Sequence, residues 1–371
     1  MIYLDNAATT AKKPHSVLRD IKRNIKRQYG NPGRGSHILS VRAGEVIYDT
    51  REALSALLSA PCPENVVFTY NATYALNIAI KAMVHEKCHI IISDMEHNSV
   101  YRPVIALCEQ YGCEYSVFNT AAKSILSEIE GLIRSDTKIL ISTLSSNVNG
   151  REVPLEALSY VRRKHGIKLV IDASQAVGHK RINLSESPCD ALCAPGHKAL
   201  FGLQGTGFIY FDENFDGKTI IEGGSGNESA NINMPRLLPE RFEAGTLSTP
   251  AIASLKAGIK YIENIGIERI EAKIVYLTNA LLDRLSSVKS VSMLDGNNGV
   301  VSFNLKETDC ERVAWLLNAR GIFVRSGLHC APLAHKAIGT LESGTVRVSL
   351  SVLNTEKELD IFYRAITEIS R

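Results

Sequence analysis

Near the middle of the chain, residues 169–175 read Leu169-Val170-Ile171-Asp172-Ala173-Ser174-Gln175, an apolar run that ends in an acid. Similar short runs lie on both sides of it, separated by segments whose apolar residues recur at helical spacing. The expected strands are 66–69, 89–93, 114–118, 138–143, 169–172 and 190–193, and the expected helices include 72–83, 98–111, 124–133 and 155–164. This alternation predicts an α/β fold with a mostly parallel sheet and helices on both of its faces. A further strand at 207–211 follows a glycine-rich turn and is a candidate for an antiparallel addition.

The pattern differs towards both ends of the chain. Helices are expected at 16–29 and 40–58, and residues 223–239 read as a long functional loop. After Pro250 we expect helices at 251–264, 267–286, 310–320 and from 356 onward, with strands at 299–305, 322–325 and 345–350. The sequence therefore predicts a large α/β domain over 16–250 and a smaller α+β domain formed by 251–371 with an N-terminal arm, 1–15.

Composition excludes several classes of protein. The chain has 371 residues, 45% of them hydrophobic and 22% charged, with a net charge of +3, so electrostatics predicts neither nucleic acid nor a membrane as partner. No apolar run approaches the roughly 20 residues that span a bilayer. The first residues, Met1 to Asn6, do not resemble a signal peptide, so we expect a cytoplasmic protein. The eight cysteines are expected to be mostly reduced, and their spacing predicts no metal site.

Common nucleotide sites are also excluded. A dinucleotide site requires Gly-x-Gly-x-x-Gly between a strand and a helix, and residues 202–207 have the wrong spacing and precede a strand. The Gly-x4-Gly-Lys-Ser/Thr phosphate loop does not occur either.

Two residues together indicate a different cofactor. Lys198 lies in Ala194-Pro195-Gly196-His197-Lys198, where apolar surroundings would lower its pKa as a Schiff-base lysine requires. Asp172 ends a buried strand, where an α/β sheet binds ligands, and a carboxylate there would keep a pyridine nitrogen protonated. Alone, Lys198 could lie in a plain loop and Asp172 could cap a helix. Together they favour pyridoxal 5'-phosphate.

Two further motifs fit this cofactor. His97, in Met95-Glu96-His97-Asn98, could stack on a pyridine ring, although a surface turn is an equal interpretation. Thr73 follows a strand and begins a helix, where backbone N–H groups favour a phosphate. A simple helix cap is the alternative for Thr73.

In this order and spacing, the motifs resemble the class V aminotransferase branch of fold type I pyridoxal-phosphate enzymes. Within it they are similar to group II cysteine desulfurases and selenocysteine lyases. The segments that carry the resemblance are Tyr3–Thr10, Asn31–His37, Glu96-His97, Ser146–Val148, Asp172–Gln175, Gly196–Lys198, Glu243–Thr246, Arg325–Ala331 and Arg347–Ser349.

The resemblance implies a role for each matching residue. Lys198 would form the Schiff base and move the substrate proton, Asp172 would pair with the ring nitrogen, and Gln175 would bond the ring oxygen. His97 would stack on the ring, while the Ala72 amide, Thr73 and His197 would hold the phosphate. Thr246 would come from the other subunit of a homodimer. Arg347 would bind the substrate carboxylate, and Asn147 would lie beside that carboxylate and the ring oxygen of the cofactor. His37 and Arg325 would line the substrate entrance.

The resemblance also assigns a thiol. Cys330 would take sulfur from L-cysteine as a persulfide and release L-alanine, with His329 and Arg325 favouring its thiolate. A sulfur-acceptor protein would then receive the sulfur. Pro195 and Leu328 depart from the usual serine and histidine of the group, and both indicate a divergent subfamily.

Other functions stay open at this point. L-selenocysteine is an alternative substrate, because selenocysteine lyases also retain a cysteine at this position. Transamination or C–S β-elimination would use Lys198, Asp172 and Arg347 without a thiol at 330. A non-catalytic scaffold that binds a partner is disfavoured by the complete set of site residues.

Overall fold

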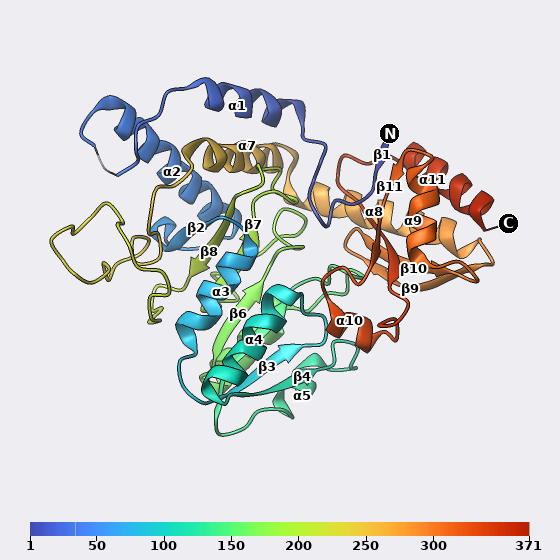
Figure 1. The fold of residues 1–371 in the computed structure, drawn as a ribbon, viewed down its shortest axis with the longest axis horizontal. Coiled ribbons are helices and arrows are strands. Elements are labelled where there is room, and N and C mark those ends of the chain that lie inside the picture. The colour runs from blue at the N-terminus through green and yellow to red at the C-terminus, as the bar shows by residue number, and fades with distance from the viewer. Residues whose placement is uncertain (34, 371) are drawn as a thin grey trace.

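A seven-stranded and a four-stranded sheet lie side by side in the computed structural model, which describes residues 1–33 and 35–370 (Figure 1). Arg34, part of the Asn31–His37 motif, lies outside the described residues. The larger sheet has seven strands: β2 (Val66–Thr69), β3 (His89–Ser93), β4 (Glu114–Phe118), β5 (Thr137–Thr143), β6 (Lys168–Asp172), β7 (Ala191–Pro195) and β8 (Gly207–Phe211). These bounds agree with the expected strands to within two residues at each end.

The large sheet is mostly parallel, as the sequence predicts. Its order is β2-β8-β7-β6-β5-β3-β4, and every pair from β7 to β4 is parallel. Strand β8 runs antiparallel to both β7 and β2, which confirms the antiparallel addition. Because Thr143 of β5 pairs with Asp172, and Asp172 pairs with Cys193 of β7, the carboxyl ends of the central strands form one edge.

Helices cover both faces of this sheet. Their bounds are α1 (His15–Lys26), α2 (Ile38–Leu57), α3 (Ala72–Met83), α4 (Asn98–Tyr111), α5 (Ile125–Glu130), α6 (Leu155–His165) and α7 (Thr249–Ile265), with a 3-10 turn at Pro63–Asn65. Alternation along β5 separates two cores: Leu140 packs with residues of α1, α2, α5, α6 and α7, whereas Ile139 and Ile141 pack with α3 and α4. Strands buried on both faces are expected to be continuously apolar, as these are.

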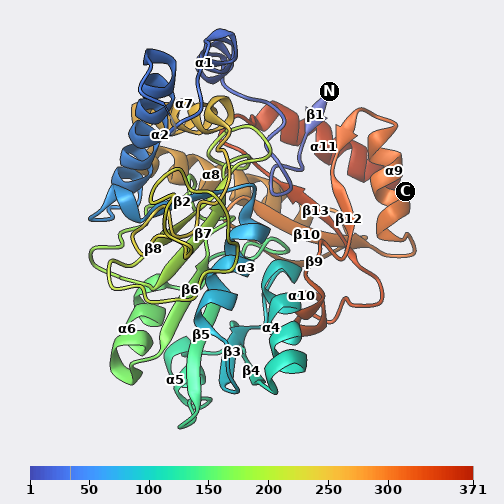
Figure 2. The same ribbon diagram turned by 60° about the vertical axis from the view of Figure 1, so that its left-hand side comes forward.

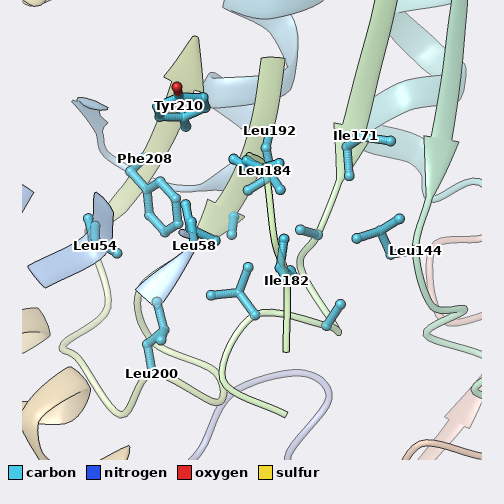
Figure 3. Packing of buried hydrophobic residues seen from close by; sticks show 14 of the residues in the cluster. Leu54, Leu58, Leu144, Ile171, Ile182, Leu184, Leu192, Leu200, Phe208 and Tyr210 are labelled. Carbon is cyan, nitrogen blue, oxygen red and sulfur yellow. The ribbon is translucent and has the colours of Figure 1, made fainter. Parts of the chain in front are cut away.

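Figure 3 shows the first of these cores at the β7–β8 side of the sheet. Leu54 of α2 and Leu58 lie near Phe208 of β8, and Leu192 of β7 lies near Leu184. All five side chains are buried, and each contributes about 1.5–3 kcal/mol by leaving water. This packing anchors the two strands that lead into and out of the Gly196–Lys198 turn.

The smaller unit combines four antiparallel strands with helices on one side (Figure 2). Its elements are α8 (Ile267–Ser286), β9 (Val291–Asn297), β10 (Val300–Leu305), α9 (Cys310–Asn318), β11 (Ile322–Phe323), β12 (Arg325–Gly327), α10 (Pro332–Ala337), β13 (Thr345–Ser349) and α11 (Glu356–Ile369). The sheet order is β12-β13-β10-β9, and strand β1 (Ile2–Tyr3) pairs with β11 in a separate parallel ladder. The N-terminal arm thus joins the C-terminal unit.

The structure differs from the expectations at several places. The single strand expected at 322–325 is two strands, because β11 pairs with β1 while β12 pairs with β13. Strand β9 and helix α10 were not expected, and the helix expected at 124–133 spans only Ile125–Glu130. In addition, α7 packs on the core of the large sheet with α1 and α2, although the predicted boundary at residue 250 places it in the small domain.

The chain between β8 and α7 is irregular. Described residues 212–248 form no helix or strand, and this segment projects at one end of the molecule in Figure 1. Among the described helices, none combines the length and apolar character needed to cross a membrane.

Candidate active site

A pocket of about 200 Å³ lies at the carboxyl edge of the large sheet, where it meets the small unit. Ten of the sequence-predicted site residues line it: Ala72, Thr73, His97, Asn147, Asp172, Gln175, His197, Lys198, Arg325 and Arg347. They come from both units and from segments up to 275 positions apart in the chain. The fold therefore brings most of the predicted set into one cavity.

Three predicted residues do not line this pocket. Cys330 is exposed beside it, adjacent to the lining residue His329. Thr246 lines a separate apolar hollow with Tyr70 and Tyr74. His37 precedes helix α2 and is exposed, outside the pocket. Within a single chain, the predicted contributions of His37 and Thr246 therefore remain predictions.

Lys198 has the surroundings expected of a reactive amine. It lies in the turn between β7 and β8, and its carbonyl accepts hydrogen bonds from Thr10 Oγ1 at 2.8 Å and from the Phe201 N–H at 3.0 Å. Burial lowers the pKa of Lys198 to about 8, and nearby Arg347 and Arg325 lower it while Asp172 opposes them. Its Nζ makes no hydrogen bond or ion pair with any described residue. The amine is therefore free to react at moderately alkaline pH.

Asp172 and Gln175 lie across the same cavity. Asp172 ends β6, and its Oδ1 accepts the N–H of Ser174 at 2.9 Å, whereas its Oδ2 has no partner among the described residues. Gln175 Nε2 donates to the carbonyl of Ala7 at 3.0 Å. One carboxylate oxygen thus remains available to a ligand.

His97 is linked to the first turn of α3 through a residue that sequence reasoning did not select. Its Nδ1 accepts the N–H of Ser99 at 3.1 Å and lies 2.9 Å from Ser99 Oγ, which is 2.8 Å from Thr73 Oγ1. Since Nδ1 accepts a hydrogen bond, the ring proton is on Nε2. Burial lowers the pKa of His97 to about 4, so the ring is neutral at pH 7.

The start of α3 provides donors for an anion. Asn71 caps this helix by accepting the N–H of Tyr74 at 3.0 Å, so the N–H groups of Ala72 and Thr73, two residues that line the pocket, are not used by the cap. His197 lies nearby, hydrogen-bonded through Nδ1 to Thr9 Oγ1 at 3.0 Å, and burial lowers its pKa to about 4. This neutral imidazole can therefore donate one N–H.

Arg347 is the principal buried cation of the pocket, with 1% of its surface exposed. Its Nη1 donates to the Asn147 carbonyl at 3.0 Å, and Nη2 donates to Asp5 Oδ1 at 2.5 Å. Among the described residues, its Nε has no partner. Sequence reasoning did not assign Asp5 a role; its position in the Tyr3–Thr10 motif was the only signal.

The Cys330 turn is held in an unusual backbone conformation. His329 and Cys330 both have positive φ, 49° and 58°, which side chains other than glycine rarely adopt. Two hydrogen bonds from the large unit hold the turn: Asn147 Nδ2 donates to the His329 carbonyl at 2.8 Å, and the Asn98 N–H donates to the Cys330 carbonyl at 2.7 Å. Arg325 Nη2 lies 3.6 Å from Cys330 Sγ.

The expectation that His329 favours the Cys330 thiolate is wrong. His329 is buried, its Nε2 lies 3.0 Å from Thr345 Oγ1, and burial lowers its pKa to about 2. A neutral imidazole supplies no positive charge, so of the two residues expected to favour the thiolate only Arg325 carries one, 3.6 Å from the sulfur. Separately, no group of three or more potential metal ligands gathers among residues 1–33 and 35–370.

Comparison with known proteins places this geometry in a family. The family model for class V aminotransferases matches residues 2–362. The chain is 31% identical over 384 residues to a probable cysteine desulfurase of Mycolicibacterium paratuberculosis, covering 100% of this chain and 55% of that protein. It is also 31% identical over 381 residues to a probable cysteine desulfurase of Methanothermobacter thermautotrophicus, covering 100% and 94% of the two chains.

A solved structure is similar to this chain in both fold and sequence. The apo structure of the cysteine desulfurase from Thermococcus onnurineus superposes with a TM-score of 0.90 at 29% identity, covering 100% of this chain and 94% of that chain. The sheet order, the pocket and both sequence matches lead to the same assignment: the chain belongs to the class V aminotransferase family.

Proposed function

We propose that this chain is a pyridoxal-phosphate-dependent cysteine desulfurase that converts L-cysteine to L-alanine and transfers the sulfur to Cys330. The observation that carries the proposal is the position of a thiol at the mouth of a pyridoxal-phosphate-type pocket. Cys330 Sγ lies 3.6 Å from Arg325 Nη2, and Arg325 lines the same cavity as Lys198, Asp172 and Arg347.

The unpaired polar atoms of the pocket fit the cofactor. Lys198 Nζ and Asp172 Oδ2, both without partners among the described residues, suit the aldehyde and the ring nitrogen of pyridoxal phosphate. The N–H groups of Ala72 and Thr73 suit its phosphate. When bound, the cofactor supplies an electron sink for the carbon atoms of the substrate.

Residues of the chain would bind the substrate, move its proton and accept its sulfur. Arg347 would bind the α-carboxylate of L-cysteine, and Lys198, uncharged above pH 8, would accept the α-proton. The Cys330 thiolate would attack the substrate sulfur and the C–S bond would break. Overall, L-cysteine and the Cys330 thiol give L-alanine and a Cys330 persulfide, so atoms and electrons balance.

The persulfide requires an acceptor, and the exposure of Cys330 supports transfer to a partner protein.

The positions of Thr246 and His37 support a homodimer in which these two residues reach the partner's pocket. The predicted domains, 16–250 and 1–15 with 251–371, would meet at this pocket, and α7 at the start of the second would pack on the core of the first. A cytoplasmic location is part of the same proposal.

The test is to incubate the cofactor-loaded protein with L-cysteine and a thiol reductant, and to quantify alanine, sulfide and pyruvate. We expect alanine and sulfide in equal amounts, without pyruvate. Cys330→Ala should abolish both products, whereas Cys62→Ala, at a partly exposed thiol outside the pocket, should not. Pyruvate with sulfide would indicate β-elimination instead, and turnover of L-selenocysteine alone would indicate a lyase.

A further inference from the structure

Arg347 is held in an arrangement that its role as a carboxylate ligand does not itself require. The guanidinium is nearly inaccessible, and its two described hydrogen bonds go to Asn147 and Asp5. A guanidinium has five donors, so three remain for other partners, including the unpaired Nε. The 2.5 Å contact with Asp5 is the shorter of the two bonds and the only one to a charged group.

Asp5 approaches Arg347 from outside the pocket. Arg347 lines the cavity, but Asp5 does not, and the Asp5 side chain keeps 21% of its surface exposed. The Asp5 carboxylate therefore holds the guanidinium from outside the cavity in which a substrate carboxylate would bind.

The backbone around Asp5 is fixed to the strand that carries Arg347. Asp5 forms a parallel bridge with Ser349 of β13, whose N–H donates to the Leu4 carbonyl at 2.7 Å. Tyr3 Oη donates to the Asp5 carbonyl at 3.1 Å. With its main chain held on both sides, the Asp5 side chain has little freedom to follow Arg347 if the guanidinium moves.

The same arm reaches the other half of the site. The Ala7 carbonyl accepts from Gln175, Thr9 Oγ1 lies 3.0 Å from His197 Nδ1, and Thr10 Oγ1 donates to the Lys198 carbonyl. Residues 5–10 therefore join the arginine of the small unit to the lysine turn of the large one.

The charges of the pocket also require a partner for Arg347. Lys198 and Arg325 are cations in the same cavity, and Asp172 is the acid that lines it. A buried guanidinium without a counter-ion would turn towards solvent or another acceptor, since an unpaired buried charge is costly. Binding a carboxylate through two parallel bonds depends on a fixed guanidinium plane.

We propose that Asp5 is a positioning residue that holds Arg347 in the orientation that selects substrates carrying an α-carboxylate. The inference rests on the proposed function, because it assumes that an amino acid binds at Arg347. Because Asp5 does not line the pocket, it would act on a bound amino acid only through Arg347.

The test compares two ligands of the cofactor-loaded protein by the change in its visible absorbance. L-Alanine has the α-carboxylate, and ethylamine is the same molecule without it. Asp5→Ala should raise the Kd of L-alanine at least about tenfold, the effect of losing a hydrogen bond to a charged group, and leave that of ethylamine unchanged. Asp5→Asn should restore much of the affinity, because its amide oxygen can still accept from Nη2.

Asp360→Ala is the matched control, since it removes another aspartate–arginine pair of the small unit, Asp360–Arg284 at 2.6 Å, away from the pocket. It should change neither Kd. Should Asp5→Ala fail to fold, Asp5→Glu keeps the charge but displaces the oxygen, and it should weaken L-alanine more than Asp5→Asn does.

Unchanged or tighter binding of L-alanine by Asp5→Ala would overturn the proposal. Equal weakening of L-alanine and ethylamine would also overturn it, because a general structural defect does not distinguish the two ligands. If Asp5→Glu bound L-alanine as tightly as wild type, that result would also contradict the proposal. Failure of the proposed function would appear separately, as an absence of sulfide from L-cysteine with the unaltered protein.

Discussion

Replacing Glu96 with glutamine should change how the stability of the protein depends on pH. Glu96 is fully buried beside His97, and its Oε1 accepts hydrogen bonds from Ser93 Oγ at 2.5 Å and the Thr143 N–H at 2.8 Å. Its Oε2 has no partner among the described residues. The pKa of Glu96 is raised to about 8, mainly because the side chain is buried. The hydrogen bond from Ser93 lowers this pKa, and the nearby Asp172 carboxylate raises it.

The sign and size of the effect follow from this pKa. Between its ordinary value of 4.5 and about 8, Glu96 keeps a proton in the folded state that it loses in the unfolded state. The free energy of unfolding should therefore fall with rising pH by about 1.4 kcal/mol per unit in this range. Glutamine binds no proton in either state. From pH 5.5 to 7.5, the stability of Glu96→Gln relative to wild type should rise by roughly 2–3 kcal/mol.

Urea unfolding followed by circular dichroism at pH 5.5, 6.5 and 7.5 measures this difference. Comparing the variant with wild type at each pH cancels the titration of all other groups. Glu114→Gln is the control: Glu114 is exposed and paired with Arg134 at 2.7 Å, which lowers its pKa, so its difference from wild type should be constant above pH 5.5. A constant difference for Glu96→Gln as well would refute the reasoning.

Three further outcomes are expected. Gly258→Ala should reduce the free energy of unfolding by about 1–3 kcal/mol or more, because the new Cβ would overlap the Leu200 carbonyl. Urea titration measures this, and an unchanged unfolding midpoint would contradict it. The rate of pyridoxal phosphate uptake, followed by absorbance, should rise with pH as Lys198 loses its proton, reaching half of its maximum near pH 8. A half-maximum near pH 10, the range of an ordinary lysine, would contradict this. Ser99→Ala should lower kcat/KM for L-cysteine about fivefold, with little change in thermal midpoint, since His97 loses one hydrogen bond; equal rates would show that the backbone N–H suffices.

Much of the large sheet could be predicted because its strands are buried on both faces. Strands such as His89–Ser93 and Ala191–Pro195 are short apolar runs bounded by polar or glycine-rich segments. Strand β9, Val291–Asn297, contains serine, aspartate, glycine and asparagine, so it lacked this signal. Helix α10 has six residues, too few for a helical period to be recognised.

The site was predictable to the extent that single residues carry their own chemical context. Lys198 and Asp172 each follow an apolar strand, and that position alone indicates a ligand. The neutral state of His329 could not be predicted, because it depends on burial beside Thr345 and His335, which only the tertiary structure supplies. A histidine next to a cysteine in sequence is not necessarily its electrostatic partner.

The least predictable part of the site is its dependence on the first ten residues. An extended arm with no periodic pattern gives no local signal for a function, and Asp5 and Arg347 are 342 positions apart. Yet the arm supplies the only described counter-ion of Arg347 and also bonds to Gln175, His197 and Lys198. Removal of the arm would leave all of these residues in the chain but would remove the hydrogen bonds that join Arg347 to the other three. The chemistry of this site therefore depends on contacts that connect the two units, in addition to the residues that line the pocket.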